Sequence, residues 1–201
     1  MKYWEGVNRM NESDRKIMSV MQRKIRLLFP SKAALARLRR SVGKEYGAMP
    51  EILEYVLPEH ELSDYPAKER QIEIALYTAL TLYAFHQQGS IECVSVSLGE
   101  NDSAVSNRNT FGHAIRKLSS VAKNPEGVLR RFNQVLTAND LLELSTHARG
   151  LISLLKQSRL ALDYPLLAVD LYHFQQSEMR RNVILVWGRD YYMNKREGEE
   201  K

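Results

Sequence analysis

The fold is decided by residues 109–174, which read NTFGHAIRKLSSVAK (109–123), VLRRFNQVLTANDLLELSTHARGLISLLKQSR (128–159) and LDYPLLAVDLYHF (162–174). In the first segment Phe111, Ile115 and Leu118 recur at helical spacing, whereas His113 and Arg116 fall on the opposite face. We therefore expect one face to pack against other helices and the other to be basic. The three segments together predict a succession of linked helices.

Two breaks divide this stretch. Asn124 and Pro125 end the first helix, because proline disfavours a helical conformation in the residue before it. Thr137 and Asp140 have the spacing of a capping box, which predicts the start of a new helix. The face that this helix turns to the core is expected to carry Leu141, Leu144, Ala148, Leu151, Ile152 and Leu155.

Basic residues line the margins of these predicted helices: Arg116, Lys117, Arg130, Arg131, Arg149 and Lys156. Arg149 and Lys156 are seven residues apart, which places them on one flank of a helix. Most of the six have no acidic residue three or four positions away, so their charge is not neutralised within the helix. Phosphate groups would neutralise it.

A second group of cations lies near the N-terminus. Residues 15–44 contain ten basic residues and no acidic one, and since the whole chain carries +5, the remainder carries −5. Ser31 is expected to cap a helix on which Arg37, Arg40 and Lys44 form one outward stripe at i, i+3 and i+7. Like charges on one helical face repel each other, so this stripe does not stabilise the fold.

The remaining segments predict an all-α protein, an elongated helical bundle with two small helical lobes. Residues 67–88 are expected to form the longest helix, apolar nearly all round and therefore surrounded by others. Residues 90–98 alternate like a strand, but no second strand is evident and we expect a loop or a weak extended piece. The predicted divisions are an N-terminal lobe (1–90), a linker (91–109), a C-terminal lobe (110–193) and a disordered tail (194–201).

Several classes of function lack their usual residues. Cys93 is the single cysteine, and the five histidines never recur three to five positions apart, so we predict no metal site. No phosphate-binding glycine loop is present, and we expect no cofactor, no catalytic residue and no enzymatic activity. The charged first twenty residues and the short apolar run at 74–85 predict no signal peptide and no membrane contact. The single cysteine favours a reducing compartment, so we expect a cytoplasmic protein.

The order of these segments resembles a known family. The succession FGHAIRKLS, LRRFNQVLTAND, ISLLKQSR and LDYPLLAVDLYHF, with LYTALTLYAFHQQ before it and VILVWGRDYY after it, is similar to the CasB family, the small subunit of the type I-E CRISPR Cascade complex. The resemblance spans most of residues 31–193. It implies a non-catalytic subunit, present in two copies, that helps hold the target and displaced DNA strands of a crRNA-guided R-loop beside other Cascade subunits.

Ten cations are our candidate nucleic-acid-binding residues: Arg37, Arg39, Arg40, Lys44, Arg116, Lys117, Arg130, Arg131, Arg149 and Lys156. Isolated cations such as Arg180 are interpreted as solvated surface. Five aromatic residues are interpreted as core rather than as base-stacking platforms, namely Tyr77, Tyr83, Phe85, Tyr172 and Trp187. Binding would then depend on backbone charge and read little sequence.

Two other functions remain open. A helical adaptor could use the basic face to bind an acidic protein, in which case nucleic acid would be irrelevant. A helix-turn-helix regulator is less favoured, because no second helix begins with the Asn, Gln and Arg cluster that base reading favours. The adaptor and the nucleic-acid-binding subunit differ in their response to salt, since only the latter should lose affinity for oligonucleotides steeply as salt rises.

Overall fold

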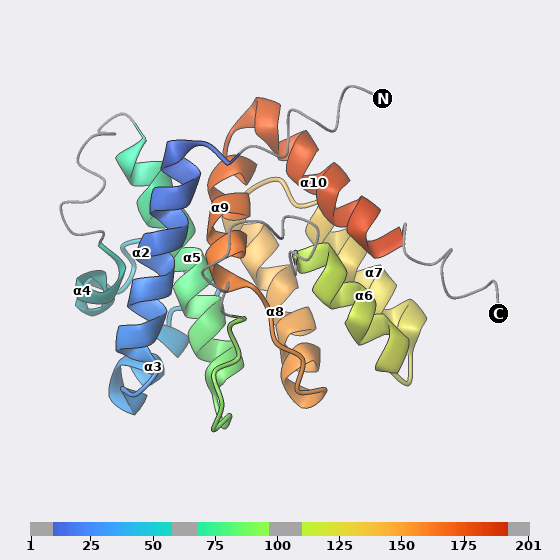
Figure 1. Cartoon of the computed structure of the whole chain (residues 1–201), viewed down its shortest axis with the longest axis horizontal. Helices are drawn as coiled ribbons and strands as arrows, with labels where there is room; N and C mark the ends of the chain where they lie inside the picture. Colours follow the sequence, from blue (N-terminus) through green and yellow to red (C-terminus); the bar gives the residue numbers. More distant parts are fainter. Residues whose placement is uncertain (1–9, 58–67, 97–109, 193–201) are drawn as a thin grey trace.

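A computed structural model describes residues 10–57, 68–96 and 110–192. Within these ranges the chain is all-α, as predicted (Figure 1). The helices are α2 (Glu12–Leu28), α3 (Lys32–Arg39), α4 (Leu53–Val56), α5 (Glu69–Gln87), α6 (Phe111–Val121), α7 (Pro125–Leu136), α8 (Leu141–Gln157), α9 (Tyr164–Phe174) and α10 (Ser177–Tyr192), with a 3₁₀ turn η1 (Pro50–Ile52) before α4. The predicted tail lies outside the described residues, as does most of the predicted linker.

Side-chain caps set most helix starts. Ser31 caps α3 as predicted, with its hydroxyl accepting the backbone N–H of Ala34. The prediction for α8 was wrong by one turn, because its N-cap is Asp140, whose carboxylate accepts the N–H of Glu143 at 2.8 Å. Thr137 instead ends α7, where its hydroxyl donates back to the carbonyl of Asn133. The two residues therefore belong to two different helix ends, since Thr137 ends α7 and Asp140 begins α8.

The cationic stripe predicted on α3 does not continue along one helix. The helix ends at Arg39 with Arg40 as its C-cap, and Gly43 adopts a φ of 75°, a left-handed conformation that glycine tolerates without strain. Lys44 therefore follows a turn and does not share a helical face with Arg37. The predicted i, i+3, i+7 register was wrong because the helix ends at Arg39 and turn residues separate it from Lys44.

Helix α5 lies at the centre of the bundle. It packs against α9, α8, α3 and α2, and its residues from Ile72 to Ala84 are almost all buried, as the all-round apolar pattern predicted (Figure 1). The segment after α5 forms a single parallel bridge between Ser95 and Leu162. The Leu162 N–H donates to the carbonyl of Val94 at 3.0 Å, so the described part of this segment, up to residue 96, is hydrogen-bonded to the chain just before α9.

The buried apolar side chains of the described residues form one continuous cluster, to which helices on both sides of the predicted linker contribute. Helix α2 packs against α9, and α5 packs against α8. Each of these pairs joins the predicted N-terminal lobe to the predicted C-terminal lobe. The division of the chain into two lobes stays a prediction.

Helix α10 crosses α6 at very close range. A Cβ placed on Gly112 would lie 2.0 Å from the carbonyl oxygen of Trp187, so only glycine allows the two backbones to approach this far. The Trp187 side chain is fully buried against Phe111, with ring centroids 5.0 Å apart. Its indole N–H donates to the Asp170 carboxylate at 2.7 Å and thereby joins α10 to α9. Trp187 thus joins three helices.

Asp170→Asn is expected to stabilise the protein increasingly as pH rises. Burial raises the pKa of Asp170 to about 7, although the Trp187 N–H acts in the opposite direction. The folded chain therefore holds a proton that the unfolded chain has released, and this carboxyl loses stability as pH rises from about 4 to 7. The amide retains an acceptor for Trp187 and has no such loss, so its advantage should grow by on the order of 2 kcal/mol between pH 5 and 8.

Urea unfolding of both proteins at the two pH values measures this change. Burial also lowers the pKa of His86, to about 4, which favours unfolding as pH falls below about 6.5. That contribution is common to both proteins and cancels in their difference. A difference that is the same at pH 5 and pH 8 would show that Asp170 titrates normally in the folded state.

Candidate nucleic-acid interface

Two predicted cations converge on one aromatic ring. The Arg149 guanidinium lies 5.2 Å from the centroid of the Phe85 ring, and the Lys156 ammonium lies 5.8 Å from it. Lys156 also donates to the side-chain oxygen of Gln88 at 3.3 Å. A cation over a ring face gains electrostatic attraction without being neutralised, so this arrangement orders two side chains and preserves their positive charge.

Helix α7 brings another predicted cation beside α8. The Arg131 guanidinium donates to the carbonyl of Gly127 at 3.1 Å. Its side chain also lies across Gly150 of α8, where a Cβ would come within 3.7 Å of the Arg131 Cδ. Arg130, the preceding residue, is exposed. The packing of α7 on α8 therefore places the Arg131 side chain next to Gly150, the residue that follows Arg149 in the sequence.

The two cations of α6 lie on its outer side. Lys117 is exposed and Arg116 is half-buried, whereas Phe111, Ile115 and Leu118 are buried as predicted. Arg116 acts on Asp190 of α10, where burial raises the pKa of the carboxyl and the nearby Arg116 charge opposes that rise. The positive charge of Arg116 therefore interacts with a carboxyl group of the protein itself.

The cations at the end of α3 and just after it differ from one another in the contacts they make. Arg37 forms a salt bridge with Glu54 at 3.4 Å and donates to the Tyr55 hydroxyl at 3.0 Å. This pairing contradicts the expectation that its charge is unneutralised, and it could not be foreseen because Glu54 lies seventeen residues away. The Lys44 ammonium lies 3.4 Å from the sulfur of Met49. Among the ten candidates, only Arg37 forms a salt bridge with a described residue.

The candidate cations thus form separate groups. Arg149 and Lys156 share the Phe85 ring, and the Arg131 side chain of α7 lies against Gly150 of their helix, α8. The end of α3 and the helix α6 lie toward opposite ends of the longest axis of the molecule, with α8 between them (Figure 1). The assignment of all ten cations to nucleic acid stays a prediction, and the group on α8 has the best defined geometry.

Phe85 packs against the buried core, as predicted, and also contacts the two cations. It is half-buried, and part of its ring meets the cations. Its position on α5 gives no sign of this contact, because Arg149 and Lys156 come from a helix more than sixty residues further along the chain. The other four aromatic residues that we interpreted as core are buried.

No group of three or more His, Cys, Asp or Glu side chains among the described residues is placed to hold a metal ion. His86 is fully buried and shares a hydrogen bond of 3.0 Å with the Tyr164 hydroxyl, so it serves the core. His173 meets Asp14 at 2.8 Å and joins α9 to the start of α2. No helix in the described parts of the chain is long and apolar enough to cross a membrane.

Comparisons with known proteins agree on one family. Residues 34–192 match the family described as CRISPR-associated protein Cse2. The crystal structure of CasB from Thermobifida fusca is similar, with 28% sequence identity, a TM-score of 0.70, and coverage of 88% of this chain and 98% of that chain. No curated protein sequence matches.

Two further solved structures share the fold at lower identity. CasB from M. ruber is 23% identical with a TM-score of 0.64, and the alignment covers 89% of this chain and 95% of that one. A chain from a structure titled CRISPR RNA-guided surveillance complex is 17% identical with a TM-score of 0.61, covering 91% of this chain and 99% of that one. Each aligns along nearly its whole length.

Proposed function

The chain belongs to the Cse2 family of CRISPR-associated proteins, and on that basis we propose that it is a non-catalytic subunit of an RNA-guided surveillance complex, where it binds nucleic acid without sequence preference and stabilises the R-loop. The solved surveillance complex contains a chain of the same fold, which supports membership in such an assembly. The partners would be crRNA, both strands of the target DNA, the other subunits and a second copy of this chain. The protein would act in the cytoplasm.

The observation that carries this proposal is the pair of cations on Phe85. Neither Arg149 nor Lys156 has a carboxylate within ion-pair distance among the described residues, yet both side chains are held in place by the ring. Because the ring already orders both side chains, they lose less conformational entropy when they contact a phosphate. A fixed cation that contacts phosphate rather than a base edge binds any sequence.

Contacts between fixed cations and strand backbones would allow a subunit without catalytic groups to contribute to defence. Forming an R-loop exchanges a DNA duplex for an RNA–DNA duplex of similar stability, so the balance is close to neutral. A few additional contacts to the strand backbones then decide whether the R-loop persists. Such contacts require positive charge in a fixed place and no bond cleavage by this chain.

Reversing both cations, in the double variant Arg149→Glu and Lys156→Glu, is expected to shorten the lifetime of the R-loop. Two lost phosphate contacts of roughly 0.5–1 kcal/mol each correspond to a lifetime about 5–30 times shorter. The measurement is the dissociation of a matched target from a complex reassembled with the wild-type or the variant chain.

A matched control reverses two exposed cations outside the candidate set, Arg15 and Arg181. Both lie near the N-terminal ends of their helices, Arg15 as the fourth residue of α2 and Arg181 as the fifth of α10, where glutamate is compatible with the helix dipole. We expect this control to leave the lifetime unchanged. If the complex assembles fully and the two double variants behave alike, the nucleic-acid role is refuted and the adaptor is favoured.

A further inference from the structure

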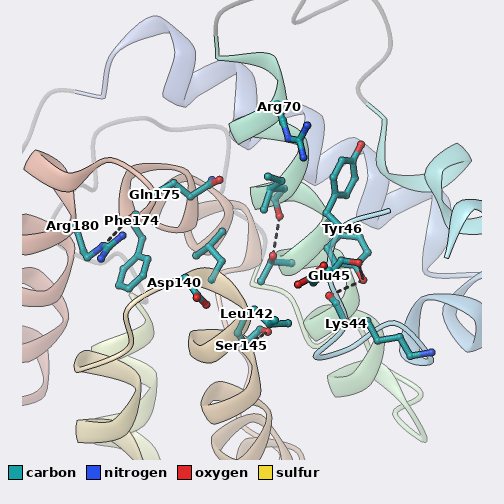
Figure 2. A pocket seen from close by; sticks show the side chains of 14 residues that line it. Lys44, Glu45, Tyr46, Arg70, Asp140, Leu142, Ser145, Phe174, Gln175 and Arg180 are labelled. Atoms are coloured by element: carbon teal, nitrogen blue, oxygen red, sulfur yellow. Dashed lines mark hydrogen bonds between the residues drawn. The ribbon is translucent and has the colours of Figure 1, made fainter. Parts of the chain in front are cut away.

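A cleft lies between four parts of the chain that are distant in sequence (Figure 2). Its walls come from the first half of α5, the start of α8, the junction of α9 with α10, and the turn at residues 44–46. Its volume is about 380 Å³, near the lower end of the range of about 300–1,000 Å³ found for small-molecule sites. A group of the size of one nucleotide fits this volume, whereas a base pair in a duplex does not.

Part of the wall of the cleft is apolar, although Phe174 is fully buried and Leu141 nearly so. Ile74, Leu141, Leu142 and Phe174 line it, and Leu142 is 38% exposed although it is a large hydrophobic residue. An exposed apolar side chain in a concave site gains free energy when a flat apolar surface covers it. Nucleobases present such surfaces.

The polar groups of the cleft are largely satisfied within the protein. The Thr78 hydroxyl donates to the carbonyl of Ile74 at 2.8 Å, and the Ser145 hydroxyl donates to that of Leu142 at 2.9 Å. The amide nitrogen of Gln175 donates to the carbonyl of Gln71 at 2.7 Å. With these donors engaged, the wall offers little means of distinguishing one base edge from another.

Three basic side chains lie at the rim of the cleft. The Arg180 guanidinium lies 4.9 Å from the centroid of the Phe174 ring, and its Nε donates to the Phe174 carbonyl at 3.0 Å, which leaves its two terminal amino groups for a ligand. Arg70 is exposed in the first turn of α5 on another side of the cleft (Figure 2). Lys44, one of the predicted phosphate-binding residues, also lines the cleft.

Two carboxylates line the cleft as well. Asp140 uses one oxygen to accept the N–H of Glu143, and it lies at the positive end of the α8 dipole. Glu45 is exposed. Together with the cations Lys44, Arg70 and Arg180, these two carboxylates leave the lining with one net positive charge. That charge favours a ligand with a single phosphate over a peptide with several acidic side chains.

We propose that this cleft binds one unpaired nucleotide of a nucleic-acid strand. The base covers Leu142, while Arg180 and Arg70 attract the phosphate of the same nucleotide. Lys44 connects the cleft to the other cations at the end of α3, so a strand that follows those cations would reach it. The inference rests on the proposed function, because it names the form of nucleic acid that one part of the surface accepts.

The test compares two single strands with the same number of phosphates. One is an oligothymidylate and the other is the same strand made of abasic units, and fluorescence anisotropy gives the affinity of the full chain for each at low salt. Because burying apolar surface contributes roughly 25 cal/mol per Å², covering Leu142 with a base should make the strand with bases bind severalfold more tightly. Leu142→Asp should remove most of that preference, whereas Arg180→Gln should weaken the binding of both strands.

Arg181→Gln is the matched control, since Arg181 adjoins Arg180, is exposed and does not line the cleft. It should keep the preference, and thermal unfolding checks that every variant is folded. Equal affinity for both strands, or a preference that survives in the Leu142 variant, overturns the cleft proposal and leaves the phosphate-binding function standing. If neither strand binds and an acidic peptide does, the cleft proposal and the proposed function both fail.

Discussion

Trp187→Ala is expected to lower the free energy of unfolding by about 3–5 kcal/mol, which is a large part of the stability of a domain of this size. The side chain is fully buried, and its removal leaves a cavity where α6, α9 and α10 meet. The substitution also takes the indole N–H from the Asp170 carboxylate. Urea unfolding monitored by circular dichroism measures the loss, and a loss below about 1 kcal/mol would show that α10 is not part of the cooperative core.

Two glycines provide a paired control at the same helix crossing. Gly112→Ala places a methyl group 2.0 Å from a backbone oxygen, so α6 and α10 must separate. Gly188→Ala meets no atom within 4 Å and lies inside α10, where alanine is the better helix former. The first should destabilise by roughly 1–3 kcal/mol and the second should stabilise by up to about 1 kcal/mol. Similar effects at both positions would contradict the close crossing.

The helices and their buried faces could be predicted because they are local properties. Apolar spacing identified the buried residues of α8, and all-round apolarity identified α5 as the central helix. Helix ends were less accurate, as Thr137 and Asp140 show, because two adjoining ends offer similar capping residues. The glycine that permits the α6–α10 crossing could not be recognised, since its role depends on a backbone more than seventy residues away.

The candidate site was predictable only as a set of residue types. The sequence identified Arg149 and Lys156 as neighbours on one flank, and the structure places both on Phe85. It could not show that Arg37 is paired with Glu54 or that Arg180, interpreted as solvated surface, lines a cleft. These contacts join elements that are far apart in the chain, and charge alone carries no information about which elements meet.

Raising salt from 50 to 200 mM is expected to weaken binding of the full chain to DNA by on the order of a thousandfold. The estimate assumes about six phosphate contacts, which the ten candidate cations can supply. Each contact releases counterions from the DNA, so the logarithm of affinity should fall linearly with the logarithm of salt. Because phosphates are the same at every position, strands of different sequence should show the same slope. Arg149→Gln should reduce that slope by about one contact.

The salt titration of the full chain on random-sequence single- and double-stranded DNA is the most direct test of the central claim that this surface holds polyanionic strands by its unpaired cations. We predict binding at 50 mM salt that falls steeply and equally for all sequences. Failure to bind at 50 mM salt, or an affinity that does not change with salt, would contradict the account and favour an adaptor that recognises a protein.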